Sequence, residues 1–337
     1  MWRRVTAQAL LAMIGLALLA GCAKGDLTWP VLEARYASPA SLFADLPGGL
    51  HVHYRDQGDP KAARTLVLVH GFAASLQAWE PWVARLAPRY RVISLDLPGH
   101  GLTRAPGGYR ASGDADVAVI DELTRRLGAR RFVLGGNSMG GGIAWSYALA
   151  HPDRLDGLIL VDAAGWPHPA KPAGGSVVLF KLLGNSAGRA VLARIDPTPM
   201  AKRGLRQAYV DPTLVTPALV ARYVDLARAP GHREILLTRN AGPRKPVTPA
   251  TFSAIVTPTL VLVGAVDTVI PADVSRGLAG AIPGAKLIVY PGVGHVPMEQ
   301  IPDRSAADVQ TFVDALPRGW TPRGGLDAAA AQPKVAR

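Results

Sequence analysis

A serine flanked by glycines stands in the pentapeptide Gly136-Asn137-Ser138-Met139-Gly140. An apolar run, residues 131–135, precedes it, and a helix-forming run, residues 143–150, follows it. This order of strand, tight turn and helix is typical of a nucleophile elbow, whose crowded backbone demands small residues two positions before and two positions after the serine. Ser138 is therefore predicted to be a catalytic nucleophile.

Two residues downstream of the serine complete a candidate triad. A serine hydroxyl needs a histidine to take its proton, and that histidine needs a carboxylate to orient it. Asp267 follows the apolar run 259–264, and His295 follows the apolar run 286–290. Because the carboxyl ends of parallel strands meet at one edge of a sheet, both side chains are expected beside Ser138.

Other aspartate and histidine residues have competing or simpler interpretations. Asp162 ends another apolar run and is the alternative acid of the triad. His70 is expected to brace a neighbouring loop, and His100 to shape a loop between two glycines. His51 and His53 alternate along a segment that we expect to be a half-solvated strand.

Acyl transfer builds negative charge on a carbonyl oxygen, and two backbone N–H groups must face that charge. The amide of Met139, directly after the nucleophile and at the start of a helix, is one expected donor. The apolar run 65–69 leads into His70-Gly71-Phe72. The Phe72 amide is the second expected donor of this oxyanion hole.

These motifs together resemble those of the α/β-hydrolase fold superfamily, in the branch with a helical cap. The resemblance implies a mostly parallel central sheet flanked by helices, with the cap inserted after the sixth strand. The motifs that carry it are His70-Gly71-Phe72, the segment 96–101, the elbow 136–142, Gly264-x-x-Asp267 and Gly294-His295.

The expected activity is hydrolysis of a small-molecule ester or other acyl substrate, with no metal or organic cofactor. Dehalogenases and epoxide hydrolases of this fold use an aspartate at the elbow, so Ser138 argues against both. Carbon–carbon bond hydrolases of ring-fission products are an alternative, although they usually carry a tryptophan where this chain has Val296. A non-catalytic binding lipoprotein on a hydrolase scaffold is a further alternative.

The N-terminus resembles that of a bacterial lipoprotein. A short basic region at Arg3 and Arg4 precedes twelve apolar residues, 9–20, which are too few to span a bilayer and indicate a signal peptide. The sequence Leu19-Ala20-Gly21-Cys22 resembles a lipobox, which predicts that Cys22 is lipidated. The protein is then exported and anchored on the periplasmic side of a membrane, and Ala23 favours the outer membrane.

The formal net charge is +12, and much of it lies in one stretch. Between residues 163 and 250 there are 13 lysines and arginines against 4 acids. A basic cap could attract anionic lipid headgroups or anionic substrates. An ordinary solvated surface is the alternative, and nucleic-acid binding is not expected because the basic residues are scattered over proline-broken segments.

The cap is expected to set substrate choice through apolar residues around Val177, Leu179 and Phe180, while the triad below stays generic. The predicted organisation is a signal peptide (1–21), a tether (22–36), the hydrolase core (37–163), a helical cap (164–250), the rest of the core (251–317) and a disordered tail (318–337).

Overall fold

The structure is a computed structural model, and it describes residues 24–167, 188–189, 192–239, 246–319 and 321. Within them, eight strands form one sheet in the order β1-β2-β4-β3-β5-β6-β7-β8. The pairs β1–β2 and β2–β4 are antiparallel, and all other pairs are parallel. The strands are β1 (Leu42–Leu46), β2 (Leu50–Gln57), β3 (Thr65–Val69), β4 (Arg91–Leu95), β5 (Phe132–Asn137), β6 (Leu155–Val161), β7 (Thr259–Gly264) and β8 (Lys286–Tyr290).

Helices cover both faces of this sheet, which explains why its central strands are apolar along their whole length. Along β3, Val67 and Val69 pack into the layer that includes α4, α5 and α12, whereas Leu66 and Leu68 pack toward α3 and α14. The flanking elements are η1 (Leu76–Trp79), α3 (Glu80–Leu86), α4 (Gly113–Arg126), α5 (Met139–Ala150), η2 (Pro152–Arg154), α12 (Ala272–Ala281), α13 (Pro297–Gln300) and α14 (Pro302–Asp314).

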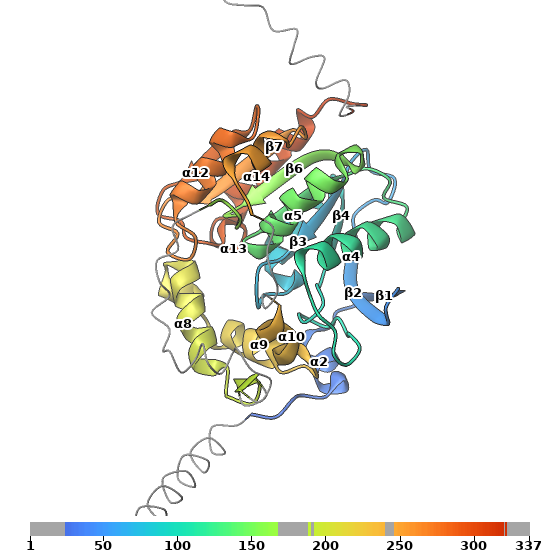
Figure 1. The fold of residues 1–337 in the computed structure, drawn as a ribbon, viewed down its shortest axis with the longest axis vertical. Coiled ribbons are helices and arrows are strands. Elements are labelled where there is room, and N and C mark those ends of the chain that lie inside the picture. The colour runs from blue at the N-terminus through green and yellow to red at the C-terminus, as the bar shows by residue number, and fades with distance from the viewer. Residues whose placement is uncertain (1–23, 168–187, 190–191, 240–245, 320, 322–337) are drawn as a thin grey trace, which may run out of the picture.

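The helical cap lies between β6 and β7, so the expected α/β-hydrolase architecture with an insertion after the sixth strand is confirmed. Figure 1 shows α8, α9 and α10 grouped at one end of the molecule. Val177, Leu179 and Phe180, the expected pocket residues, lie outside the described part of the chain. The described elements of this insertion are α8 (Thr198–Tyr209), η3 (Pro212–Leu214), α9 (Pro217–Ala227), α10 (His232–Thr238) and α11 (Pro249–Ser253).

The segment expected to be a tether is partly folded. Residues 29–36 form the helix α2 (Trp29–Tyr36), whose Leu32 is fully buried in a cluster with Leu226 of α9. The Arg35 guanidinium and the Tyr36 hydroxyl both donate to Asp225, at 2.7 and 2.8 Å. Trp29 adds an edge-on ring contact with His232 of the cap at 5.6 Å. Residues 29–36 are thus packed against the cap.

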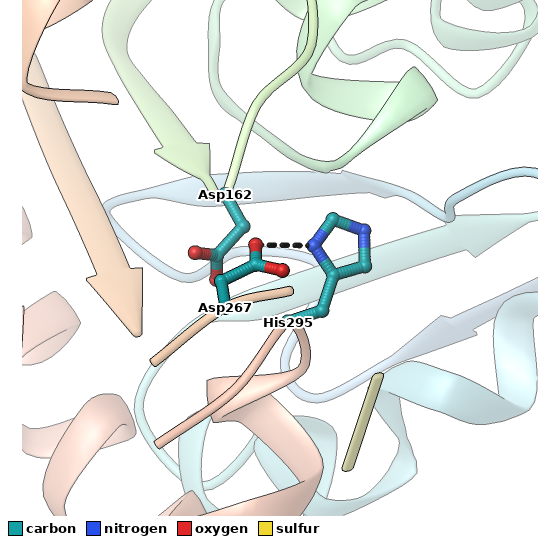
Figure 2. A group of neighbouring side chains, drawn as sticks. All are labelled: Asp162, Asp267 and His295. Atoms are coloured by element: carbon teal, nitrogen blue, oxygen red, sulfur yellow. Dashed lines mark hydrogen bonds and ion pairs between the residues drawn. The ribbon is translucent and has the colours of Figure 1, made fainter. Parts of the chain in front are cut away.

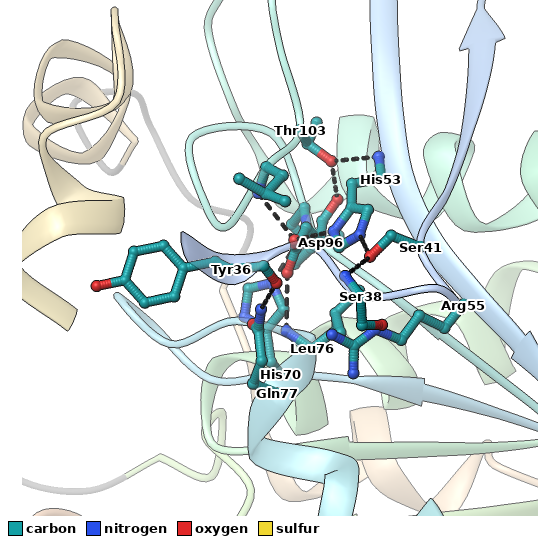
Figure 3. A network of polar contacts seen from close by, with 12 residues as sticks. Tyr36, Ser38, Ser41, His53, Arg55, His70, Leu76, Gln77, Asp96 and Thr103 are labelled. Atoms are coloured by element: carbon teal, nitrogen blue, oxygen red, sulfur yellow. Dashed lines mark hydrogen bonds and ion pairs between the residues drawn. The ribbon is translucent and has the colours of Figure 1, made fainter. Parts of the chain in front are cut away.

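A polar network joins β1, β2 and the loop after β4 (Figure 3). His53 on β2 contacts Asp96 through Nδ1 at 2.6 Å and Ser41 Oγ through Nε2 at 2.8 Å. Asp96 also accepts hydrogen bonds from the backbone amides of Leu76 and Leu102. The expectation of a half-solvated strand holds for His51 but is wrong for His53, which is fully buried because the carboxylate of Asp96 satisfies its ring nitrogen.

None of the described helices is long and apolar enough to cross a bilayer.

Candidate active site

Ser138 occupies the turn between β5, which ends at Asn137, and α5, which begins at Met139. Its φ of 55° lies in the left-handed region, where a non-glycine residue is strained by about 1–3 kcal/mol. A Cβ on Gly136 would come within 2.2 Å of the Gly140 carbonyl oxygen, and one on Gly140 within 2.2 Å of the Val69 carbonyl oxygen. The geometry is that of the predicted elbow, and it explains why both glycines are needed.

His295 and Asp267 meet at the same edge of the sheet, each in the loop after its strand (Figure 2). The Nδ1 atom of His295 lies 2.6 Å from Asp267 Oδ2. The other carboxylate oxygen, Oδ1, accepts from the amides of Val269 and Ile270 at 2.7 and 3.0 Å. Three contacts therefore hold Asp267 in place, and its bond to Nδ1 leaves Nε2 as the proton acceptor for a serine.

The Ser138 hydroxyl makes no hydrogen bond to His295 within the described residues. Such catalytic contacts are often long in a free enzyme and shorten when substrate binds. Position at the elbow and the histidine–aspartate pair thus define the candidate triad.

Asp162, the alternative acid, lies beside Asp267 rather than against the imidazole (Figure 2). Its Oδ1 accepts from the Gly264 amide at 3.0 Å, and its buried Oδ2 has no donor among the described residues. Burial and the neighbouring charge of Asp267 raise the pKa of Asp162 well above its ordinary value. Both effects favour the protonated form of Asp162, which lies behind the His295–Asp267 pair.

The same three groups could surround a metal ion, because their donor atoms lie within 4.8 Å of one another. Their present contacts favour another use. The His295 nitrogen that faces the carboxylates is bonded to Asp267, and the raised pKa of Asp162 disfavours the ionised form that a metal ion needs.

The loop after β3 approaches the nucleophile closely. A Cβ on Gly71 would lie 3.2 Å from the Cβ of Ser138, so the backbone of this loop passes directly beside the serine. Phe72, one residue further along, and Met139, the first residue of α5, are the two expected oxyanion donors. These two residues come from different elements that meet at the serine, as an oxyanion hole built from two backbone amides requires.

His70 braces this loop as expected. Its Nε2 accepts from the Leu97 amide at 3.1 Å, so Nδ1 carries the proton and donates to the Gly71 carbonyl at 2.8 Å. Burial lowers the pKa of His70, and burial lowers that of His100 well below its ordinary value. Both imidazoles are neutral, and they hold the loops after β3 and β4.

Two supports of the site were not expected from the sequence. The Asn137 side-chain amide donates to the His295 carbonyl at 3.0 Å and to the Val161 carbonyl at 3.2 Å. The His295 amide donates to the carbonyl of Ala208 in the cap at 2.8 Å. Asn137 stands next to the nucleophile and could have been suspected, whereas a backbone carbonyl carries no sequence signal.

The elbow, the histidine–aspartate pair and the mixed sheet define a hydrolase of the α/β-hydrolase fold. The chain belongs to the alpha/beta hydrolase family, whose model matches residues 66–309.

Known relatives differ in the reactions that their names describe. A 2-hydroxy-6-oxononadienedioate/2-hydroxy-6-oxononatrienedioate hydrolase of Paraburkholderia phymatum is 31% identical over 74% of this chain and 87% of its own length. A pimeloyl-[acyl-carrier protein] methyl ester esterase of Pectobacterium carotovorum is 28% identical over 74% of this chain and 94% of its own. The solved structure of a membrane phospholipase A superposes with a TM-score of 0.67 at 26% identity, covering 94% of this chain and 99% of its own.

Proposed function

We propose that this hydrolase is a serine carboxylic ester hydrolase that acts through an acyl-enzyme on Ser138. The observation that carries the proposal is the placement of a strained serine at the same edge of the sheet as the buried His295–Asp267 pair, with Asn137 beside the serine bonded to the His295 carbonyl. The esterase and phospholipase among its relatives support an ester substrate.

In the proposed reaction, the Ser138 oxygen attacks the acyl carbon while His295 Nε2 takes the hydroxyl proton. The Nδ1 proton stays on His295 and is donated in a hydrogen bond to Asp267, whose negative charge stabilises the imidazolium. The Phe72 and Met139 amides hold the tetrahedral oxyanion. His295 then protonates the departing alcohol, and a water molecule activated by the same imidazole releases the acid and restores Ser138.

Carbon–carbon bond hydrolysis is the second candidate, because it uses the same triad and because the Paraburkholderia relative carries such a substrate name. The chain has Val296 after the candidate histidine, where ring-fission hydrolases usually have tryptophan. This position favours the ester reading.

A substrate panel separates the two candidates. The full-length protein is assayed with p-nitrophenyl esters from acetyl to palmitoyl and with a ring-fission dienoate, each with Ser138→Ala as the background. We expect the esters to be turned over with the higher kcat/KM. A higher kcat/KM for the dienoate would replace the ester proposal, and Ser138-independent turnover would refute both.

We also propose that the protein is exported and lipid-anchored through Cys22, which lies outside the described residues. The lipobox-like sequence supports this location, and so does the membrane phospholipase A among similar structures. Two or more acyl chains give stable anchoring where one chain is marginal. In a Gram-negative host the protein should incorporate labelled palmitate, and Cys22→Ser should not. Wild-type protein recovered as a soluble, unlabelled periplasmic species would contradict the anchor.

A further inference from the structure

The basic residues of the cap fall into two groups. Several form ion pairs: Arg233 with Asp26 at 2.6 Å, Arg222 with Glu299 at 3.5 Å, and Arg239 with Asp116. Because each of these arginines is paired with an acid, it adds little positive potential at the protein surface. These three arginines add to the basic composition without producing a basic surface.

The helix α8 is different. Its Lys202, Arg203 and Arg206 are exposed, the helix contains no acidic residue, and no described residue forms an ion pair with any of the three. Helical neighbours lie three and four positions apart, so Arg206 stands next to both other cations. Three positive charges thus share one face of a single helix.

A groove of about 550 Å³ runs between α8 and α9 beside these cations. Lys202 and Arg206 line it together with Lys24 and Arg228, against a single acid, Asp225. Lys24 is held by Asp196 at 2.9 Å and Arg228 lies 3.9 Å from Asp225, so the two α8 cations have no acidic partner among the described residues. The groove therefore suits an anionic group such as a phosphate.

Exposed apolar side chains stand at both ends of the same helix. Met200 is 77% exposed in its first turn, and Val210 and Leu214 are exposed just after its end. A soluble anion would make no use of these side chains. Cations interleaved with exposed apolar groups are typical of a surface that rests on a bilayer, where apolar groups enter the interface and cations meet phosphates.

We propose that α8 and the adjoining groove form a docking surface for anionic phospholipid headgroups of a membrane. The described chain begins at this surface, as expected if the lipid-anchored N-terminus holds it near the membrane. The Lys24 amide donates to the Arg194 carbonyl at 2.9 Å, and its ammonium donates to Thr198 Oγ1 at 3.1 Å. Lys24, the first described residue, is thereby bound at the start of α8, and it follows Cys22 by two positions in the sequence.

The opposite end of α8 is bonded to the candidate active site. The carbonyl of Ala208 accepts from the His295 amide, and that of Gln207 accepts from Thr268 Oγ1 at 3.0 Å. A bilayer bound along α8 would therefore lie against the helix that holds the histidine loop. This expectation rests on the proposed ester hydrolysis: docking should raise the turnover of ester substrates that are presented by an anionic membrane.

The test compares two triple variants of the full-length chain that carry the same charge change. The first is Lys202→Gln/Arg203→Gln/Arg206→Gln. The control is Lys61→Gln/Arg130→Gln/Lys286→Gln, whose exposed cations lie at or near the amino ends of β3, β5 and β8, at the edge of the sheet opposite the active site. Binding is measured by co-sedimentation with phosphatidylcholine vesicles and with vesicles of equal parts phosphatidylcholine and phosphatidylglycerol.

Wild type and control should prefer the anionic vesicles, and the α8 variant should lose roughly 100-fold of this preference, since each basic residue at such a surface contributes about 1 kcal/mol. The difference should vanish in 1 M salt, where the Debye length is about 3 Å. Turnover of soluble p-nitrophenyl acetate should be equal in all three proteins. Because vesicle binding is read without catalysis, an inactive wild type would refute the proposed function and leave the docking result standing.

Equal binding of the α8 variant and wild type would overturn the proposal. An equal loss in the control would also overturn it, because net charge rather than α8 would then govern binding. Vesicle binding is also measured with millimolar glycerol phosphate and with a control buffer of the same ionic strength. If glycerol phosphate abolishes vesicle binding and the control buffer does not, the groove takes a soluble phosphate instead of a bilayer, and the proposal is overturned.

Discussion

Two buried histidine–aspartate pairs in the described part of the chain have the same short contact. His295 Nδ1 lies 2.6 Å from Asp267, and His53 Nδ1 lies 2.6 Å from Asp96. The second pair even has a serine in place, since Ser41 Oγ lies 2.8 Å from His53 Nε2. By hydrogen bonds alone, the Ser41–His53–Asp96 group is a more complete relay, meaning a serine, histidine and aspartate joined in sequence, than the group at Ser138.

What separates the two pairs is the surroundings of the serine. Ser138 stands in strained backbone at the start of α5, beside the loop that carries Phe72, one of the two proposed oxyanion donors. Ser41 precedes an edge strand, and its oxygen also accepts from the Ser38 amide at 3.0 Å. A relay becomes a nucleophilic site only where the hydroxyl is presented to a substrate and backbone donors await the oxyanion.

The largest expected difference is between the two serines. Ser138→Ala should lower kcat on p-nitrophenyl esters by about 10⁴-fold or more, as removal of a triad nucleophile does. Ser41→Ala should stay within about twofold, because it removes one peripheral hydroxyl. A fluorophosphonate probe should label wild type and Ser41→Ala and leave Ser138→Ala unlabelled. Labelling that depends on Ser41 would reverse our assignment of the two relays.

The second comparison concerns the two carboxyl groups behind His295. Asp267→Asn should cost about 10⁴-fold in kcat, because the asparagine amide opposes the required tautomer. Asp162→Asn should cost less than about tenfold, since one hydrogen bond contributes about 1 kcal/mol. Both are measured as kcat/KM across pH. If the two costs are exchanged, Asp162 is the acid of the triad.

The smallest effects concern the pH dependence of the unfolding free energy, which should have opposite signs for Asp96, beside His53, and for Asp162, beside the candidate triad. Burial opposes ionisation of Asp96, but its hydrogen bond to His53 and the charge of that histidine prevail and lower the pKa of Asp96 to about 2, from 3.8. The ~2 kcal/mol that this shift contributes is present above pH 3.8 and is lost as the pH falls through about 2. The advantage of wild type over Asp96→Asn in unfolding free energy should therefore shrink on acidification.

Asp162 should behave in the reverse way. Its raised pKa stabilises the folded protein fully below pH 3.8, and this contribution is lost as the pH rises toward the folded pKa. An asparagine does not ionise, so the Asp162→Asn variant does not lose this contribution. Its unfolding free energy relative to that of wild type should therefore rise with pH, by up to ~1.4 kcal/mol per pH unit. Urea unfolding at several pH values checks both variants. Parallel pH trends would contradict the neutral state of Asp162.

Much of the site could be predicted because it is encoded locally. Gly136 and Gly140 reveal the elbow through short-range sterics, and the apolar runs before Asp267 and His295 reveal their strands. Less could be predicted wherever the partner lies far along the chain. The burial of His53 depends on Asp96, 43 residues away, so alternation along β2 alone suggested a half-solvated side chain.

The sequence by itself determined the α/β-hydrolase fold, the elbow at Ser138 and the order of the candidate triad, because steric demands and strand periodicity act over a few residues. Only the tertiary structure shows which of Asp162 and Asp267 contacts the imidazole, since both follow strands at the same sheet edge and the loop after β7 brings Asp267 to His295. It also decided which cap cations stay unpaired. Partners such as Asp26 for Arg233 lie some 200 residues away, and packing alone brings them together.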